Sequence, residues 1–289
     1  MIGVALAGGL LAAAGLVLWT APGWLMQPLA RRYPGCLYQV STRRPLLALT
    51  IDDGPDPAST PMIMAELRRH QARATFFLIT DRIPGREPLV RRLLAEGHEL
   101  GNHFTRDRPS IRLSPRAFEA DLLRAHRSLA PWGRTTWARP GSGWYSQAMV
   151  RVMQRHGYRC VLGSVYPLDA AIPSVAWAAG HILRNARPGA IVVLHDGGSR
   201  GRRAARILAE VLPELRRRGY QVVSLSGLMA AARAPLSGTS SRSPDPGLRS
   251  QCPPASSHTS DADSPVRRTH EIPYLQSVRR RRFRRPARL

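Results

Sequence analysis

The sequence predicts an α/β fold built on a parallel sheet, closed or open. Short apolar runs alternate with longer amphipathic runs from Pro45 to Met229, which is the pattern of strands followed by helices. This alternation is too regular for a β-sandwich, whose strands follow one another without helices between them. The chain has 289 residues and 43% hydrophobic content, which is enough for one substantial core with extensions.

Seven apolar runs are expected as strands, and the stretches between them as helices. The first helical stretch, Thr60 to His70, carries Ile63, Met64 and Leu67 on one face. The stretch from Ser114 to Leu129 begins with an N-cap serine and a first-turn proline. Functional groups gather at the carboxyl ends of the strands in such sheets. The expected strands are Leu46 to Ile51, Ala74 to Ile79, His98 to Asn102, Thr136 to Arg139, Tyr158 to Ser164, Ala190 to His195 and Gln221 to Ser224.

The two ends of the chain differ in composition from this central region. Residues 1–22 are expected to form a transmembrane signal anchor, because they carry no charged side chain and the run from Ile2 to Trp19 is apolar. Residues 23–44 are expected as a linker and residues 45–232 as the folded domain. Residues 233–289 are rich in Ser, Pro and Arg, which predicts a disordered basic tail. Such a tail either binds an anionic lipid or wall polymer, or is solvated without a partner.

The basic residues narrow the classes of chemistry. All 43 of them are arginine, against 19 acidic residues, which gives a net charge of +24. The absence of lysine excludes phosphate loops that need a lysine, kinase-type sites and Schiff-base chemistry. Arginine at every basic position, beside abundant Ala, Gly and Pro, indicates a compositional bias. We therefore expect no nucleic acid partner, although the charge alone would favour one.

The three cysteines do not form a recognisable motif. Cys36, Cys160 and Cys252 are odd in number and widely spaced, which predicts neither a disulfide framework nor a zinc knuckle. Because Cys160 lies on an expected buried strand, it is interpreted as a core residue.

A pair of carboxylates follows the first expected strand. Asp52 and Asp53 stand directly after the apolar run and before Gly54 and Pro55. A calcium loop is excluded, because its twelve-residue spacing requires Glu at the position of Ile63. A solvated Asp-Gly-Pro turn and a catalytic pair remain as alternatives. Adjacent carboxylates repel each other, so a catalytic pair requires a positive group beside it.

Three further strand ends carry polar groups. The third expected strand leads to His103, with Asp107 four residues later. If a helical turn begins there, both side chains lie on one face and can bind one metal ion, with Asp53 as a third ligand. Alone, His103 is either a loop histidine or a ligand. The fourth strand ends at Arg139 and the sixth at His195.

The first strand end resembles a known family motif. The first motif of the polysaccharide deacetylases, carbohydrate esterase family four, is similar to the run Thr50, Ile51, Asp52, Asp53, Gly54, Pro55. The other strand ends follow that family's order. The resemblance implies an α/β fold that is a distorted (β/α) barrel of about seven strands. It also implies a metal-dependent hydrolase that removes N-acetyl groups from N-acetylglucosamine-containing polysaccharide, either peptidoglycan or chitin-like.

Carried over residue by residue, the resemblance assigns roles to the strand ends. It implies that Asp52 is the general base and that Asp53 and His103 are metal ligands. Arg139 is implied to orient the base, and His195 to be the general acid. The implied cofactor is a divalent metal ion, one of Zn, Co, Mn or Ni.

Two acidic positions depart from the family pattern or match it weakly. Asp107 stands where the family usually has a second histidine; a carboxylate still provides a ligand there and favours harder metals than zinc. Asp169 stands where the family places the aspartate that tunes the acid, but Ala170 follows it in place of the usual tryptophan.

The remaining predicted site residues are expected to contact the substrate. The third motif has Ser142 and lacks the usual aromatic residue, and the backbone N–H of Ser142 is implied as the oxyanion contact. Trp144 and Tyr145 either stack on sugar or pack in the core. Leu194 is implied as part of the acetyl pocket.

Two alternative functions remain open. Asp107 and Ala170 also fit a catalytically impaired family member that binds carbohydrate without cleaving it. The same catalytic machinery also fits a deacylase of another acylated glycoconjugate. A wall substrate predicts a membrane-anchored protein with an extracytoplasmic catalytic domain, whereas the arginines that follow the apolar run favour the opposite orientation, these being Arg31, Arg32, Arg43 and Arg44.

Overall fold

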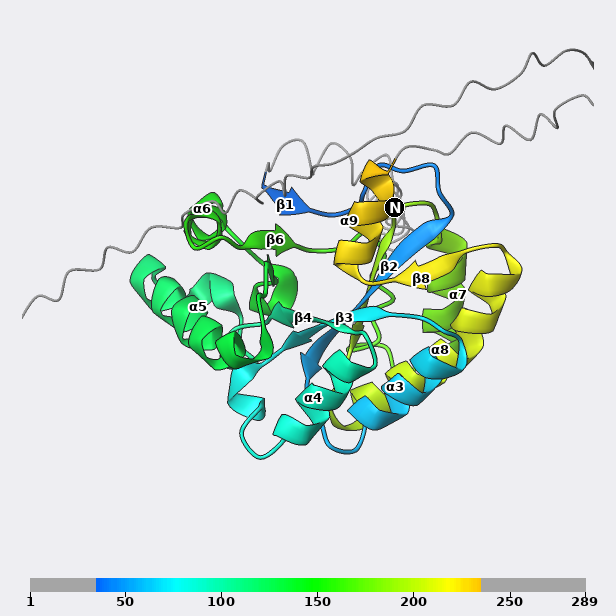
Figure 1. Cartoon of the computed structure of the whole chain (residues 1–289), viewed down its shortest axis with the longest axis horizontal. Coiled ribbons are helices and arrows are strands. Elements are labelled where there is room, and N and C mark those ends of the chain that lie inside the picture. The colour runs from blue at the N-terminus through cyan, green and yellow to red at the C-terminus, as the bar shows by residue number, and fades with distance from the viewer. Residues whose placement is uncertain (1–34, 235–289) are drawn as a thin grey trace, which may run out of the picture. The chain divides into compact units, whose positions relative to one another are not determined.

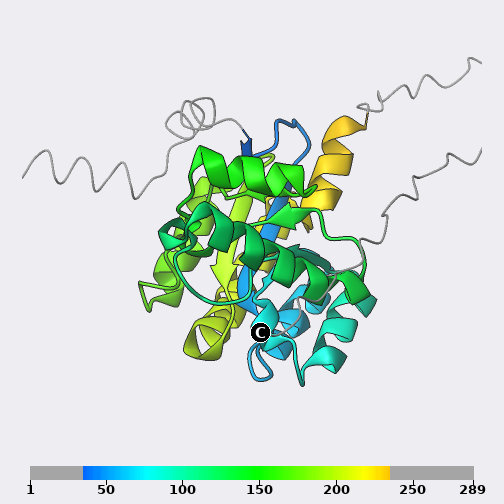
Figure 2. The same ribbon diagram turned by 90° about the vertical axis from the view of Figure 1, so that its left-hand side faces the viewer.

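The computed structural model describes residues 35–234, which form an α/β fold with helices around a parallel sheet (Figures 1 and 2). The strands are β1 (Cys36–Leu37), β2 (Leu46–Gly54), β3 (Ala74–Leu78), β4 (Glu99–Asn102), β5 (Trp137–Ala138), β6 (Arg159–Val161), β7 (Ile191–His195) and β8 (Gln221–Val223). The helices are α3 (Thr60–Arg69), α4 (Glu87–Ala95), α5 (Pro115–Leu129), α6 (Gln147–Arg155), α7 (Val175–Asn185), α8 (Gly198–Arg217) and α9 (Leu225–Arg233). Four 3₁₀ turns complete the elements, η1 (Thr80–Arg82), η2 (Ser110–Arg112), η3 (Ala130–Trp132) and η4 (Gly141–Gly143).

The sheet closes on itself in a distorted way. Its strands follow the order β1-β6-β5-β4-β3-β2-β7, and β8 pairs with the start of β2. Beyond β6 the chain runs beside β7, where the N–H of Val193 donates to the carbonyl oxygen of Val165 at 3.0 Å. This contact places the segment after β6 beside β7, from opposite sides of the strand order, which is consistent with a distorted barrel. Each of the seven runs expected as strands contains one, which confirms the α/β prediction.

The core lies on both faces of β2, which is buried along its whole length. Its neighbours β3 and β7 pair with it on either side. The predicted apolar face of α3 is buried at Ile63, Met64 and Leu67, and burial of such side chains contributes about 1.5–3 kcal/mol each. The predicted N-cap of α5 also forms, because the side chain of Ser114 accepts a hydrogen bond from the N–H of Ala117.

A disulfide corrects the prediction from the cysteines. Cys36 of β1 and Cys160 of β6 are bonded, with Cα atoms 4.7 Å apart, and they are partners in the register of the two strands. The expectation failed because β1 lies in the segment expected as a linker, residues 23–44. Without that strand, nothing in the sequence places Cys36 opposite Cys160, which is buried in the core as predicted.

The expected signal anchor at residues 1–22 and most of the expected tail at 233–289 lie outside the described residues. Among residues 35–234, no helix is long and apolar enough to cross a membrane.

The disulfide provides a stability test. Cys36→Ser is expected to lower the free energy of unfolding by about 2–4 kcal/mol, because the bond restricts the unfolded chain across a sequence separation of 124 residues. Urea denaturation of both proteins without reductant measures the difference. Reductant should bring the wild type to the level of the variant and leave the variant unchanged. Equal unfolding midpoints for oxidised wild type and variant would contradict this role.

Candidate active site

The carboxyl ends of β2 and β7 bring the predicted base and acid together. Asp52 is the register partner of His195, and the N–H of Asp196 donates to the carbonyl oxygen of Asp52 at 2.8 Å. The register of β2 against β3 shifts between Asp52 and Gly54, and Asp53 has a φ of 70°. Such a bulge redirects side chains that would otherwise alternate across the sheet. Both carboxylates therefore face the same group of charged side chains.

Arg139, directly after β5, holds the side chain of Asp52. Its Nη1 lies 2.5 Å from Asp52 Oδ1 and 2.9 Å from Thr50 Oγ1. Its other nitrogens donate to the carbonyl oxygens of Val161 and Leu162 at 3.1 and 2.6 Å. The side chains of Arg139 and Asp52 are only 3% and 5% exposed. The positive group expected beside the carboxylate pair is thus present, and it fixes the orientation of Asp52.

His195 is paired in the same way with Asp169. The imidazole Nδ1 lies 2.9 Å from Asp169 Oδ1, and the backbone N–H of His195 donates to Oδ2 at 2.9 Å. Burial lowers the pKa of His195, but the hydrogen bond and charge of Asp169, with the charges of Asp52 and Asp53, outweigh it and raise the pKa to about 9. The imidazole is therefore protonated at neutral pH, as a general acid requires.

Asp53 and His103 form a second buried pair. His103 Nε2 lies 3.4 Å from Asp53 Oδ1, while its Nδ1 donates to the carbonyl oxygen of Arg139 at 2.7 Å. Burial acts to raise the pKa of Asp53, but the hydrogen bond and charge of His103 and the charges of His195 and Arg200 lower it to about 2. With Nδ1 fixed by a carbonyl, Nε2 is the ring nitrogen available to a metal ion.

Asp107 does not lie where the sequence predicted it. No helical turn begins at His103, because Phe104 takes a left-handed φ of 65° and its ring packs on Phe118 with centroids 4.8 Å apart. The loop is then held to α5, where Thr105 Oγ1 donates to Asp121 at 2.5 Å. The four-residue spacing therefore does not bring the side chains of His103 and Asp107 onto one face.

The side chain of Asp107 is 50% exposed and makes ion pairs with two arginines. Arg82 Nη2 lies 3.7 Å and Arg200 Nη2 3.5 Å from Asp107 Oδ2. Within residues 35–234, no cluster of three or more His, Cys, Asp or Glu side chains is suited to a metal ion. Two of the predicted ligands, Asp53 and His103, fit a metal ion by their chemistry and position. The predicted set of three does not fit as a complete site.

The predicted substrate residues divide into exposed and buried ones. Ser142 is exposed in η4 with a left-handed φ of 64°, and Trp144 is 71% exposed. Tyr145 instead packs partly buried against a hydrophobic cluster and lies with its hydroxyl 2.5 Å from that of Tyr38. Leu194 is fully buried in the main core. Ser142 and Trp144 are therefore accessible to a ligand, whereas Tyr145 is partly and Leu194 fully buried.

Three charged residues near the site were not predicted. Asp196 is fully buried and accepts hydrogen bonds from Ser59 at 2.5 Å and from Thr60, which ties the start of α3 to the end of β7. Its position directly after His195 was a usable signal. Arg82 and Arg200 had no such signal, because arginine is frequent throughout the chain.

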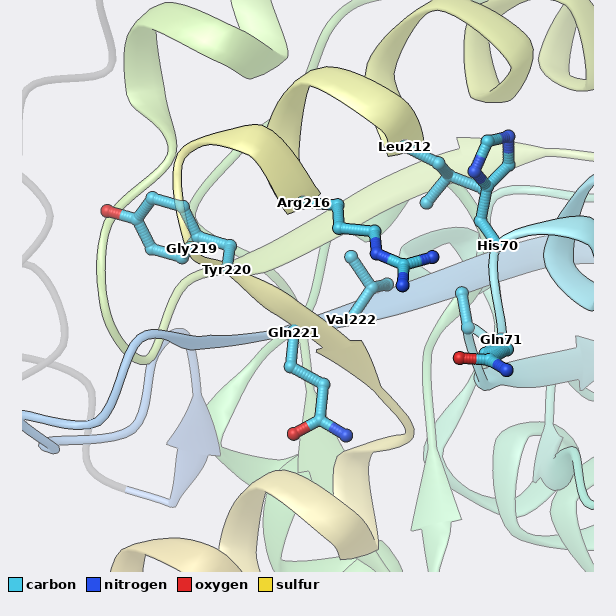
Figure 3. A pocket seen from close by; sticks show the side chains of 9 residues that line it. His70, Gln71, Leu212, Arg216, Gly219, Tyr220, Gln221 and Val222 are labelled. Carbon is cyan, nitrogen blue, oxygen red and sulfur yellow. The ribbon is translucent and has the colours of Figure 1, made fainter.

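A cavity of about 260 Å³ lies away from this chemistry (Figure 3). It is lined by side chains that include His70, Arg216 and Gln221. Gln221 pairs with Leu46 at the start of β2, whereas Asp52 and Asp53 stand near the end of that strand. The cavity therefore belongs to the opposite end of the sheet.

Comparisons with known proteins find similar sequences and a similar fold. A family model described as polysaccharide deacetylase matches residues 39–161. A peptidoglycan-N-acetylglucosamine deacetylase of Bacillus cereus is 36% identical over 195 residues, 66% of this chain and 92% of that protein. A chitooligosaccharide deacetylase of Bradyrhizobium sp. is 35% identical, covering 62% of this chain and 89% of that protein. The solved structure of the peptidoglycan deacetylase PdaC from Bacillus subtilis superposes with a TM-score of 0.60 at 27% identity, covering 66% and 93% of the two chains.

The His195–Asp169 pair predicts a specific titration. NMR of the imidazole resonances should show His195 losing its proton near pH 9 in the wild type and at clearly lower pH in Asp169→Asn. The variant loses the charge and acceptor that favour the imidazolium, while burial still disfavours it. Glu119→Gln, which removes the carboxylate partner of His156, is the matched control and should leave His195 unchanged. Titration at the same pH in wild type and Asp169→Asn would refute the coupling.

Proposed function

Because the chain belongs to the polysaccharide deacetylase family, we propose that it hydrolyses N-acetyl groups of an N-acetylglucosamine-containing polysaccharide, either peptidoglycan or chitin-like. By homology it is a carbohydrate N-deacetylase. The observation that carries the proposal is the pairing of Asp52 with Arg139 and of His195 with Asp169 at adjacent strand ends. These pairs provide an oriented base and a protonated acid side by side.

In the base step, Asp52 activates the attacking water. The carboxylate takes a proton from water as the oxygen attacks the acetamide carbonyl, and Arg139 keeps the carboxylate in one orientation. Positioned proton transfer of this kind contributes about 10² to 10⁴ in rate. Arg139 donates one hydrogen bond to Asp52 and is itself fixed by three others, to Thr50, Val161 and Leu162, so the orientation of Asp52 is kept when substrate binds.

The acid step assigns His195 to the leaving amine. An amine is a poor leaving group unless it is protonated, and the imidazolium of His195 supplies that proton. The raised pKa of His195 keeps the group charged up to about pH 9. Above that pH the acid is lost, so the rate of deacetylation should fall as pH rises through this range.

Two exposed residues are proposed to contact the substrate. The backbone N–H of Ser142 is assigned to the oxyanion of the tetrahedral intermediate, a contact worth roughly 3 kcal/mol in other acyl-transfer sites. Trp144, with 71% of its surface exposed, is available to stack on a sugar ring. Tyr145 and Leu194 are more buried than these two residues, and no substrate contact is assigned to them.

The metal ion implied by the family is part of the proposal through Asp53 and His103. A divalent ion bound there would polarise the carbonyl and lower the pKa of bound water. Its identity among Zn, Co, Mn and Ni is left to experiment. Asp107, held by Arg82 and Arg200, is not assigned a part in the reaction.

A second candidate function is supported by the incomplete ligand set. A family member that binds polysaccharide without cleaving it needs the exposed Trp144 but no third metal ligand. Retained binding of chitooligosaccharides, together with no acetate release at any metal concentration, would favour this candidate. A substrate panel in the same assay covers deacylation of another acylated glycoconjugate.

We also propose that the catalytic domain lies outside the cytoplasm, joined to a membrane anchor at residues 1–22. The Cys36–Cys160 disulfide supports this location, because such bonds form and persist in oxidising compartments. Protease added to intact spheroplasts should digest the domain. Complete protection of the domain would exclude this location and, with it, a wall substrate.

The proton-transfer assignment predicts the behaviour of one variant. Asp52→Asn should lower acetate release from chitooligosaccharides or peptidoglycan by about 10² to 10⁴, because the amide cannot accept the proton of water. Asparagine keeps nearly the shape of the side chain and an acceptor for Arg139. The measurement is acetate released per enzyme over time.

The matched control for this variant is Asp81→Asn. Asp81 is 48% exposed and pairs with Arg106 at 3.0 Å, so its loss should leave the rate unchanged. Thermal unfolding of all three proteins identifies a variant that fails to fold. An Asp52→Asn protein that is folded and as active as the wild type would rule out the base assignment.

A further inference from the structure

One guanidinium bridges two of the carboxylates predicted to hold a metal ion. Arg200 Nη1 lies 3.2 Å from Asp53 Oδ2, and its Nη2 lies 3.5 Å from Asp107 Oδ2. The other oxygen of Asp53 faces His103 at 3.4 Å. Both carboxylate oxygens of Asp53 therefore have partners. The positive charge between Asp53 and Asp107 is that of the Arg200 side chain.

Arg82 adds a second positive charge on the same side. Its Nη2 lies 3.7 Å from Asp107 Oδ2, and its Nη1 donates to the backbone carbonyl oxygen of Asp53. Asp107 is thus held between two guanidinium groups. This arrangement uses the carboxylate of Asp107 for ion pairs with Arg82 and Arg200.

The location of Arg200 on its helix is itself unfavourable. It stands in the first turn of α8, which contains no acidic residue, and the positive end of a helix dipole disfavours a cation there. The two carboxylates offset this cost. Arg202, two residues later on the same helix, is exposed, so compositional bias alone does not account for the contacts of Arg200.

We propose that Arg200 is a resident cation of this site, and that its guanidinium competes directly with a divalent metal ion for Asp53, while Asp107 helps to hold the guanidinium in place. A metal ion bound by Asp53 would stand next to the positive charge of Arg200, and like charges at such distances repel strongly. Metal binding then requires displacement of the Arg200 side chain, which is 32% exposed. The inference rests on the proposed function, because it takes Asp53 as a ligand of the family's metal.

Metal titration of the full, tag-free chain tests this competition. Isothermal titration calorimetry with Co²⁺ and Zn²⁺ compares wild type, Arg200→Gln and Arg202→Gln. Arg200→Gln should bind metal about tenfold more tightly or better, because it removes the charge between the carboxylates. Arg202→Gln removes the same charge from the same helix and should stay within about twofold of the wild type.

Two results would overturn the proposal. One is metal affinity in Arg200→Gln no higher than in the wild type. The other is an equal gain in Arg202→Gln, which would indicate a general effect of net charge. The calorimetry measures metal binding and does not depend on turnover. A lack of acetate release would therefore refute the proposed function without affecting the test of metal competition.

A second variant keeps the test valid if Arg200→Gln does not fold. Arg200→Lys retains the charge, but one ammonium group lacks the planar fork that spans two carboxylates. Its metal affinity should lie between those of the wild type and Arg200→Gln. The absorption of bound Co²⁺ gives an independent readout, and affinity equal to the wild type in the lysine variant would also contradict bridging.

Discussion

The buried ion pair of Arg139 and Asp52 is the interaction on which the rest of the site depends. A guanidinium only 3% exposed must find a partner for each of its donors. Arg139 donates four hydrogen bonds across two parts of the barrel, to Asp52 and Thr50 of β2 and to the carbonyl oxygens of Val161 and Leu162 at the end of β6. Removing one partner of such a pair costs about 3–5 kcal/mol. The relative position of these strand ends and the orientation of the base are therefore set by one side chain.

Two other carboxylates of the site also lie beside a cation. Asp169 pairs with His195 and Asp53 with Arg200. In the first pair the cation is the imidazolium of His195, which can give up its proton, so the pairing also provides an acid. In the second the cation is permanent, so the same balance opposes a metal ion. Within one group of charges, the histidine can therefore transfer a proton, whereas the arginine can only compete with a metal ion.

The sequence was sufficient to predict which side chains meet where their positions follow from the ends of strands. Asp52, Arg139 and His195 each come directly after or at the end of an apolar run, and parallel strands bring such ends together. It was insufficient where a loop conformation decides. The left-handed Phe104 breaks the helical turn on which the placement of Asp107 depended.

The pairing of strands far apart in the chain was equally unpredictable from the sequence. Two short strands far apart in the chain join Cys36 to Cys160, and a two-residue strand has no recognisable pattern. The role of Arg200 could not be predicted, because all 43 basic residues are arginine and only its contacts distinguish it from the others.

Paired charges keep the acid His195 protonated and hold the base Asp52 in one orientation. The pH dependence of kcat/KM for acetate release tests this account most directly. The wild type should lose activity as pH rises through about 9, where His195 loses its proton, and Asp169→Asn should lose it at lower pH. An alkaline limb at the same pH in both proteins would contradict the account.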